Sequence, residues 1–324
     1  MESTITADNP VLAEVVRSGF AESVHRGPVI GLGADGEPAL AEGAVREPIF
    51  PRSSSKPLQA AAMVRCGLDL DGKLLALAAA SHSGEDFHVA GAREILAGAG
   101  LTEHALQCPP GMPMDEQSLH ALIRRGGRPD RVHMNCSGKH AAMLATCVAA
   151  GWPTASYRDP AHPLQAEIRR TIERLSGEPT AAAGVDGCGA PVFAISVAGL
   201  ARAFRAMVLS EHGSPERTVA DAMRAYPEWT SGRTRPERAL MEAVPGLLLK
   251  SGAEGVQAFA LADGRAGAFK IDDGTARALP PLTVALLRRL GAAGDAAALD
   301  RAGLAEVKGG GQRVGEIRVR LGGR

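Results

Sequence analysis

The first candidate for chemistry is the segment Arg52-Ser53-Ser54-Ser55-Lys56-Pro57, which contains a Ser-x-x-Lys step. Because residues three apart lie on one face of a helix, the Ser53 hydroxyl and the Lys56 amine can reach each other there. A serine hydroxyl needs a base to become a nucleophile, and a lysine whose pKa is lowered by burial or by a second cation can be that base. The alternative is a serine-rich helix start followed by a solvated lysine.

Two later segments add a second serine and a second lysine. Ser81 lies in Ala80-Ser81-His82-Ser83-Gly84-Glu85, directly after an apolar stretch that is typical of a helix. Lys250 lies in Leu249-Lys250-Ser251-Gly252, ahead of an alternating strand-like segment. Ser-x-x-Lys followed by Lys-Ser-Gly is the order found in penicillin-recognising sites. If Lys250 faces Lys56, the two charges disfavour each other and one amine is neutral at pH 7. The alternatives are a polar helix cap and a turn with a solvated lysine.

Two loops each place a cysteine close to glycine, namely Asn135-Cys136-Ser137-Gly138-Lys139-His140 and Asp186-Gly187-Cys188. Thiolates from separate loops can bind Zn²⁺ together with a third or fourth ligand. A second interpretation makes Cys136 a nucleophile with His140 as its base, because the two are four residues apart. A third treats both cysteines as small buried residues in tight turns.

The composition excludes several classes of protein. The 324 residues carry a formal net charge of zero, and no segment concentrates Lys and Arg, so we expect neither nucleic acid nor an anionic membrane as partner. No apolar run approaches the ~18–20 residues of a membrane span. The first residues have neither the basic nor the apolar region of a signal peptide. Five cysteines, an odd number, favour reduced thiols and a cytoplasmic location.

The elements that must position these residues follow a simple order. Strand-like segments fill residues 12–49, helical periodicity runs from about 54 to 243 and includes an expected helix over 191–207, and strand character returns from 256. This order predicts an α/β fold in which the two ends form one antiparallel sheet and a helical lobe is inserted, as in serine β-lactamase-like and glutaminase-like folds. We expect a single two-lobed catalytic domain, with a sheet lobe of about 1–52 and 245–324 and a helical lobe of about 53–244.

Taken together and in order, the motifs resemble those of the class 3, or rhizobial-type, L-asparaginases of the asparaginase II family. The resemblance runs from about residue 10 to 320. The matching segments are Arg52-Ser53-x-x-Lys56-Pro57, Ser81-His82-Ser83-x-Glu85, Asn135-Cys136-Ser137-Gly138-Lys139-His140, Asp186-Gly187-Cys188 and Lys250-x-Gly252-Ala253.

The resemblance implies hydrolysis of L-asparagine to L-aspartate and ammonia by a homodimer. It implies two Ser–Lys tandems, Ser53 with Lys56 and Ser81 with Lys250. It also implies a Zn²⁺ near the substrate, important for binding more than for chemistry. The implied zinc ligands are Cys136, Lys139 and Cys188, and the expected substrate-binding residues are Arg52, Asn135 and Asp186. Lysine is an unusual zinc ligand because its amine must first lose a proton.

The expected mechanism is that of a serine amidohydrolase. A neutral Lys56 takes the Ser53 proton, Ser53 forms an acyl-enzyme, and Ser81 with Lys250 relays a proton to the leaving ammonia. Three alternatives compete with this hypothesis. They are a glutaminase or other amidohydrolase of the penicillin-recognising fold, a cysteine amidase that uses Cys136, and a small-molecule binding protein without turnover.

Overall fold

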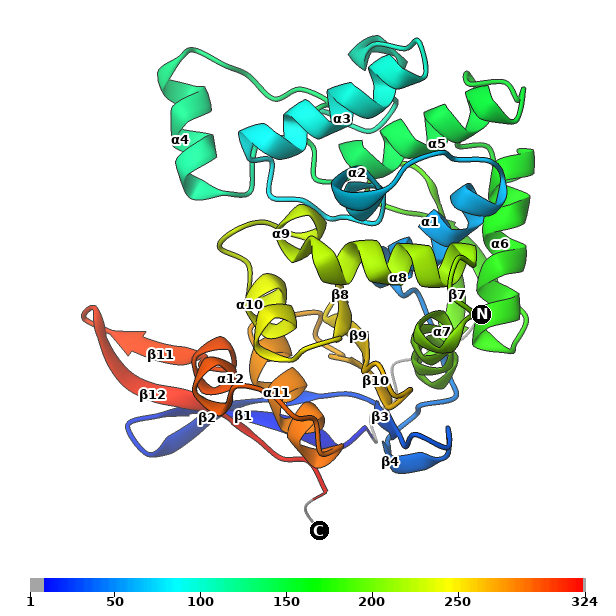
Figure 1. Cartoon of the computed structure of the whole chain (residues 1–324). Coiled ribbons are helices and arrows are strands. Elements are labelled where there is room, and N and C mark those ends of the chain that lie inside the picture. Colours follow the sequence, from blue (N-terminus) through cyan, green and yellow to red (C-terminus); the bar gives the residue numbers. More distant parts are fainter. Residues whose placement is uncertain (1–8, 323–324) are drawn as a thin grey trace.

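The computed structural model describes residues 9–322, which form an α/β protein with antiparallel sheets (Figure 1). The strands are β1 (Val11–Arg17), β2 (Phe20–Arg26), β3 (Val29–Leu32), β4 (Pro38–Glu42), β5 (Pro48–Ile49), β6 (Ala182–Val185), β7 (Pro191–Ser196), β8 (Leu248–Gly252), β9 (Val256–Ala260), β10 (Ala266–Lys270), β11 (Glu306–Gly309) and β12 (Gln312–Val319).

Helices occupy most of the chain between β5 and β8. They are η1 (Arg52–Ser55), α1 (Lys56–Arg65), α2 (Gly72–Ala78), α3 (Asp86–Gly98), η2 (Glu103–Ala105), α4 (Glu116–Arg124), α5 (Ser137–Ala149), α6 (Pro163–Ser176), α7 (Val197–Leu209), α8 (Pro215–Ala225), α9 (Pro227–Thr230) and α10 (Pro236–Ala243). Two more, α11 (Leu279–Arg289) and α12 (Ala296–Ala302), follow β10. None of the helices within residues 9–322 is both long and apolar enough to cross a membrane.

The two ends of the chain pair with each other in antiparallel sheets, as predicted. One sheet has the order β11-β12-β1-β2, and Ala13 of β1 lies opposite Val319 of β12. A second sheet has the order β4-β3-β10-β9-β8 and again joins early and late strands. The strands from the two ends of the chain therefore form two sheets instead of the single expected one. The chain passes between them at Gly27-Pro28, where proline lacks the N–H that a continuing ladder would need.

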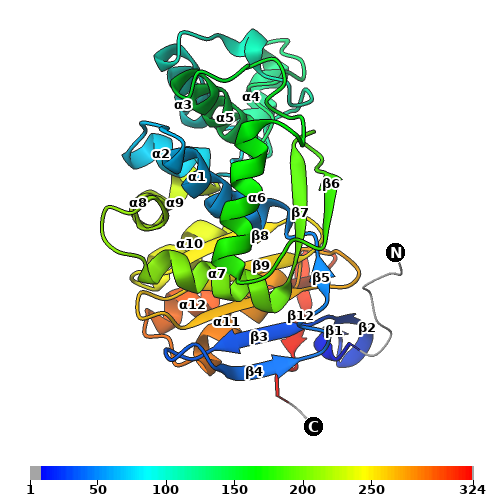
Figure 2. The same ribbon diagram turned by 90° about the vertical axis from the view of Figure 1, so that its right-hand side faces the viewer.

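One expected helix is shorter than predicted. Residues 191–196 form strand β7, and α7 begins only at Val197. The segment Pro191-Val192-Phe193-Ala194-Ile195 is buried throughout, and its β-branched and aromatic residues suit a strand between β5 and β6. The Ser196 hydroxyl then accepts a hydrogen bond from the Gly199 backbone N–H and caps the helix. Figure 2 shows this small sheet beside α6.

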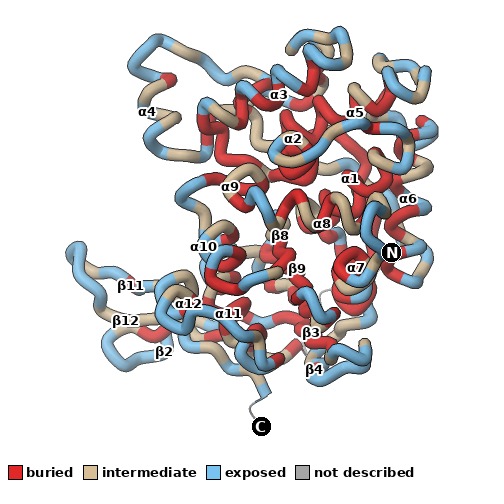
Figure 3. The backbone as a smooth tube through the Cα atoms, viewed as in Figure 1, coloured by how far each residue is buried: buried red, intermediate tan, exposed pale blue. Residues whose placement is uncertain are grey.

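The helices that carry the site pack where the helical part meets the five-stranded sheet. α1 contacts α5, α6 and α8, while η1 contacts β8 and β9. Figure 3 shows that the chain is buried along α1 and α2 and along β8 and β9. Gly252, at the end of β8, is required for this approach, because a Cβ there would lie 2.5 Å from the Pro51 carbonyl oxygen. The fold thus brings the Ser-x-x-Lys segment against the strand that carries Lys250. The predicted lobe boundaries stay a prediction.

Candidate active site

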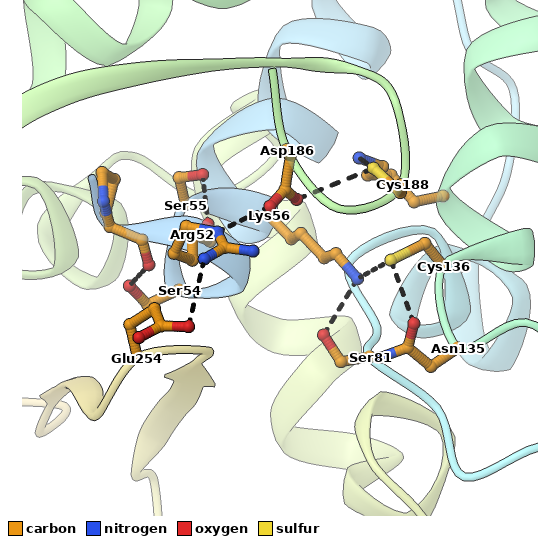
Figure 4. Close-up of polar contacts among 12 residues, drawn as sticks. Arg52, Ser54, Ser55, Lys56, Ser81, Asn135, Cys136, Asp186, Cys188 and Glu254 are labelled. Atoms are coloured by element: carbon orange, nitrogen blue, oxygen red, sulfur yellow. Dashed lines mark hydrogen bonds and ion pairs between the residues drawn. The ribbon is translucent and has the colours of Figure 1, made fainter. Parts of the chain in front are cut away.

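Lys56 lies at the centre of the polar groups that meet at this junction. It is buried in the first turn of α1, and its Nζ donates to the Ala80 carbonyl at 2.6 Å. The same Nζ donates to Ser81 Oγ at 2.9 Å and to Cys136 Sγ at 3.1 Å (Figure 4). An ammonium group has three N–H donors, and each of these three has an acceptor. This geometry fits a charged Lys56.

The structure therefore hydrogen-bonds Lys56 to Ser81. Ser53 lies in the short helix η1, and no hydrogen bond within residues 9–322 joins its hydroxyl to Lys56. The Lys56 side chain reaches to the segment that follows α2, where its Nζ donates to the Ala80 carbonyl. The predicted tandem of Ser53 with Lys56 stays a prediction.

Ser53, Ser81 and Lys250 instead meet at a cavity of about 340 Å³, which we call the catalytic cavity. Asn135, one of the expected substrate-binding residues, also lines it. Its size falls within the range of small-molecule sites. Two serine hydroxyls and one lysine amine thus face the same space.

Lys250 is the lysine whose environment disfavours charge. It is 2% exposed, and its Nζ donates to the Ser251 carbonyl at 2.9 Å. Burial lowers the pKa of Lys250 to about 7, the positive charges of Lys56 and Arg235 act in the same direction, and Glu237 opposes them. An amine with this pKa can accept and return a proton near neutral pH.

The expected substrate-binding residues Arg52 and Asp186 bind each other. Arg52 Nε donates to Asp186 Oδ1 at 2.7 Å, and Arg52 Nη1 lies 3.8 Å from Glu254 Oε1 (Figure 4). The Arg52 backbone has a φ of 51°, in the left-handed region that is strained for a residue with a side chain. The ion pair with Asp186 holds this strained residue directly before Ser53.

The predicted zinc ligands Cys136, Lys139 and Cys188 are buried together, and we call them the thiol cluster. Lys139 Nζ donates to Cys188 Sγ at 3.1 Å. A hydrogen bond from the Cys136 thiol lowers the pKa of Cys188, and the Lys139 ammonium adds to this effect. The same bond raises the pKa of Cys136, and burial raises it further. The Cys188 sulfur thus lies between two groups that lower its pKa, the Cys136 thiol and the Lys139 amine.

The chemistry of the thiol cluster suits a soft metal ion only after Lys139 loses its proton. Two sulfurs from separate loops are ligands that Zn²⁺ accepts. Burial lowers the pKa of Lys139, but the negative charge of Cys188 outweighs it and the pKa is raised. Across residues 9–322, no three His, Cys, Asp or Glu side chains form a group able to hold a metal ion. A zinc site here therefore depends on Lys139 as the third ligand.

His140 gives no support to a cysteine nucleophile. Its Nδ1 lies 2.7 Å from the Tyr157 hydroxyl, and its Nε2 makes no hydrogen bond to the described residues. Burial lowers the pKa of His140 to about 4. The raised pKa of Cys136 likewise keeps that sulfur protonated, whereas a nucleophilic cysteine needs the thiolate.

The structure also places three residues at the catalytic cavity that the motif analysis did not single out, Arg235, Glu237 and Gln257. A sequence signal for the first two exists. Arg235-Pro236-Glu237 has the proline and acidic residue of a helix start, and α10 does begin at Pro236. Gln257 is the only polar residue in the apolar strand Val256–Ala260, which was a further signal.

The sequence and the fold were compared with known proteins. The family model described as L-asparaginase II matches residues 13–319. No curated protein matches the sequence. Among solved structures, Mglu in its native form has 15% identity and a TM-score of 0.42, covering 82% of this chain and 64% of that chain. The chain thus spans less than two thirds of that protein.

Two further structures show similar values. A putative β-lactamase from Bacteroides dorei has 14% identity and a TM-score of 0.41, covering 76% of this chain and 84% of that chain. A β-lactamase from Mycobacterium bovis has 14% identity and a TM-score of 0.43, covering 82% and 94%. The family match spans nearly all of the described residues and includes every residue of the catalytic cavity and the thiol cluster. The chain therefore belongs to the L-asparaginase II family of amidohydrolases.

Proposed function

We propose that this protein is an L-asparaginase that hydrolyses L-asparagine to L-aspartate and ammonia through a serine acyl-enzyme. The observation that carries the proposal is the catalytic cavity, where two serine hydroxyls meet a lysine with a pKa of about 7. Beside it, a second lysine is hydrogen-bonded to one of the serines. The family match supports amide hydrolysis, and the substrate is the part that we propose.

In the proposed mechanism, Ser53 is the nucleophile and Lys250 is the neutral base. Ser53 Oγ bonds to the side-chain amide carbon while its proton passes to Lys250. The C–N bond then breaks, and ammonia leaves with a proton that Ser81 delivers from the two lysines, Lys56 and Lys250. Water adds to the ester and gives one proton to Lys250, Lys250 returns this proton to Ser53 Oγ as the Oγ–C bond breaks, and L-aspartate leaves. Lys56, with three hydrogen-bond partners, orients Ser81.

In this mechanism Lys250 is the neutral lysine, whereas the mechanism expected from the sequence has a neutral Lys56. Lys250 has the lowered pKa, whereas the three hydrogen bonds of Lys56 favour its ammonium form. Lys250 and Ser53 line the same cavity, so a substrate bound there contacts both.

We further propose that Cys136, Lys139 and Cys188 hold the Zn²⁺ that the family resemblance implies. When bound, the ion supplies a positive charge beside the substrate. Binding would replace the proton of Lys139 and the proton that Cys136 shares with Cys188. A homodimer and a cytoplasmic location are proposed on the same resemblance, and the five free cysteines agree with a reducing compartment.

An ammonia-release assay with L-asparagine, run beside L-glutamine, tests the proposed function. Ser53→Ala is expected to lower turnover by at least about 10³-fold, as loss of a nucleophile does in serine hydrolases. Ser156→Ala is the matched control, because this serine is exposed and lies away from the cavity. Near-normal turnover in Ser53→Ala would refute the nucleophile. Faster release from L-glutamine would make the protein a glutaminase.

A further inference from the structure

One wall of the catalytic cavity carries charged and polar groups that the proposed chemistry does not use. It is formed by Arg235, Glu237 and Gln257. We infer that this wall is the subsite for the amino-acid end of the substrate. Glu237 and Gln257 bind its α-ammonium group, and Arg235 binds its α-carboxylate. The inference rests on the proposed function and adds to it the residues that select a free α-amino acid.

Glu237 is a buried carboxylate that stays charged. It is 5% exposed and lies in the first turn of α10, where the helix dipole favours negative charge. Burial alone would raise the pKa of Glu237, but the positive charges of Arg235 and Lys250 outweigh burial and lower it. Its Oε1 accepts one long hydrogen bond, 3.3 Å from Arg235 Nη2, and the Ser251 hydroxyl also contributes to its lowered pKa. A carboxylate has about four acceptor positions, so Glu237 can accept stronger bonds from a ligand.

Gln257 supplies an independent observation. It is 2% exposed on β9, in register with Ser251, and it lines the cavity. Its Oε1 is buried and makes no hydrogen bond to any described residue. Buried amide oxygens in folded proteins nearly always have a donor. Gln257 also lines the cavity, so a ligand there that carries an ammonium group, with its three N–H donors, can supply the missing bond.

Arg235 has unused donors beside these acceptors. Its Nε is buried without a partner among the described residues, and the one hydrogen bond of its guanidinium is the long contact with Glu237. A guanidinium binds a carboxylate through two parallel N–H donors. Acceptors and donors thus lie side by side on this wall, which matches the paired charges of an α-amino acid.

The expected substrate-binding pair does not offer the same capacity. Arg52 and Asp186 are joined at 2.7 Å, and the residues that line the cavity within 9–322 do not include them. With the α-groups held at Arg235 and Glu237, the side-chain amide of the substrate lies toward Ser53. Chain length and the free α-groups then decide which amide is cleaved.

Substrates that lack one α-group test the subsite directly. Succinamic acid is L-asparagine without its α-amino group, and 3-aminopropanamide is L-asparagine without its α-carboxylate. Ammonia release from each is measured for wild type, Glu237→Gln, Gln257→Leu and Arg235→Gln. Glu242→Gln is the matched control, because Glu242 is exposed on the same helix and pairs with Arg238.

We expect losses that depend on the group deleted. Glu237→Gln and Gln257→Leu lower kcat/KM for L-asparagine by about 10- to 100-fold, chiefly through KM, and leave succinamic acid nearly unchanged. Arg235→Gln lowers kcat/KM for L-asparagine to a similar extent and leaves kcat/KM for 3-aminopropanamide nearly unchanged. Equal losses on all three amides would overturn the inference, since Glu237 would then act only through Lys250. Circular dichroism checks that each variant is folded.

The inference also has a test that does not need turnover. If wild type releases no ammonia from any amide, the proposed function fails, and calorimetric binding of L-aspartate and succinate then tests the subsite alone. Tighter binding of L-aspartate than of succinate in wild type supports the subsite if Glu237→Gln loses this preference. Equal binding of both ligands, or a preference that Glu237→Gln retains, overturns it.

Discussion

The thiol cluster and the catalytic cavity are both polar and largely buried, but they differ in how far their groups are satisfied. In the thiol cluster, Lys139 donates to Cys188 and Lys56 donates to Cys136. In the cavity, Gln257 Oε1 and Arg235 Nε have no partner among the described residues. In the thiol cluster both sulfurs thus have a donor, whereas in the cavity two buried polar atoms have no partner among the described residues.

This difference separates residues that hold the site together from residues that meet a ligand. Buried polar groups with all their partners make a local structure rigid, whereas unpaired ones raise the free energy of the empty state. Lys56 links the two regions, because its amine contacts Ser81, which lines the cavity, and Cys136 of the thiol cluster. A change in the thiol cluster therefore reaches Ser81 through Lys56.

The strongest test of the comparison is Lys250→Met. The substitution removes the proposed base but keeps an unbranched side chain in a buried position, so we expect a loss of about 10²–10⁴-fold in kcat with the fold retained. Ammonia release measures the rate, and thermal unfolding checks the fold. Lys308→Met, on exposed strand β11, is the control. Normal turnover in Lys250→Met would move the base to Lys56 and remove the distinction between the two lysines.

A smaller effect is expected from Cys136→Ser in the thiol cluster. Loss of one sulfur ligand should lower zinc affinity by about 10- to 100-fold and raise the KM for L-asparagine, with a smaller effect on kcat. Metal analysis by mass spectrometry and steady-state kinetics give both quantities. Cys66→Ser is the control, because this free thiol is half-buried and away from the cluster. Zinc content equal to wild type would exclude Cys136 as a ligand.

The pH dependence of kcat/KM is the test with the smallest expected effect. Lys250 has a pKa lowered to about 7 and has to be neutral to accept the Ser53 proton. The rate kcat/KM should therefore fall about tenfold per pH unit below pH 7 and level off above it. Because Glu237 raises the pKa of Lys250, Glu237→Gln should move this limb to lower pH. If the acidic limb of the profile does not move in Glu237→Gln, a group other than Lys250 controls the rate.

The sequence was sufficient where chemistry is local or where motifs follow a fixed order. The strands at both ends and the helical block followed from periodicity. Ser53, Ser81 and Lys250 were named from short motifs and line one cavity, and their catalytic roles stay predictions. The helix expected over 191–207 was wrong for its first six residues, because burial between β5 and β6 outweighed the helix-start signal of Pro191. The resemblance named residues but not their hydrogen-bond partners.

The sequence could not predict hydrogen-bond partners that depend on three-dimensional packing. Lys56 reaches Ser81 because α1 packs beside the end of α2, 25 positions along the chain. Arg52 was expected at the substrate, yet it binds Asp186, 134 positions away. Gln257 gained its importance only when its amide oxygen proved to have no partner. Each of these depends on distances across the fold and not on residue type.

The pairing of β1 with β12 has a consequence for how the protein folds during synthesis. Val319 follows its partner Ala13 by about 300 residues, so at about 5–20 residues per second the ribosome delivers β12 on the order of 15–60 s after β1. During that interval the β1–β2 hairpin has one edge without a strand beside it, and exposed edges readily pair with other chains. Completing the sheet therefore depends on protecting the first strands of the nascent chain until its last strand emerges.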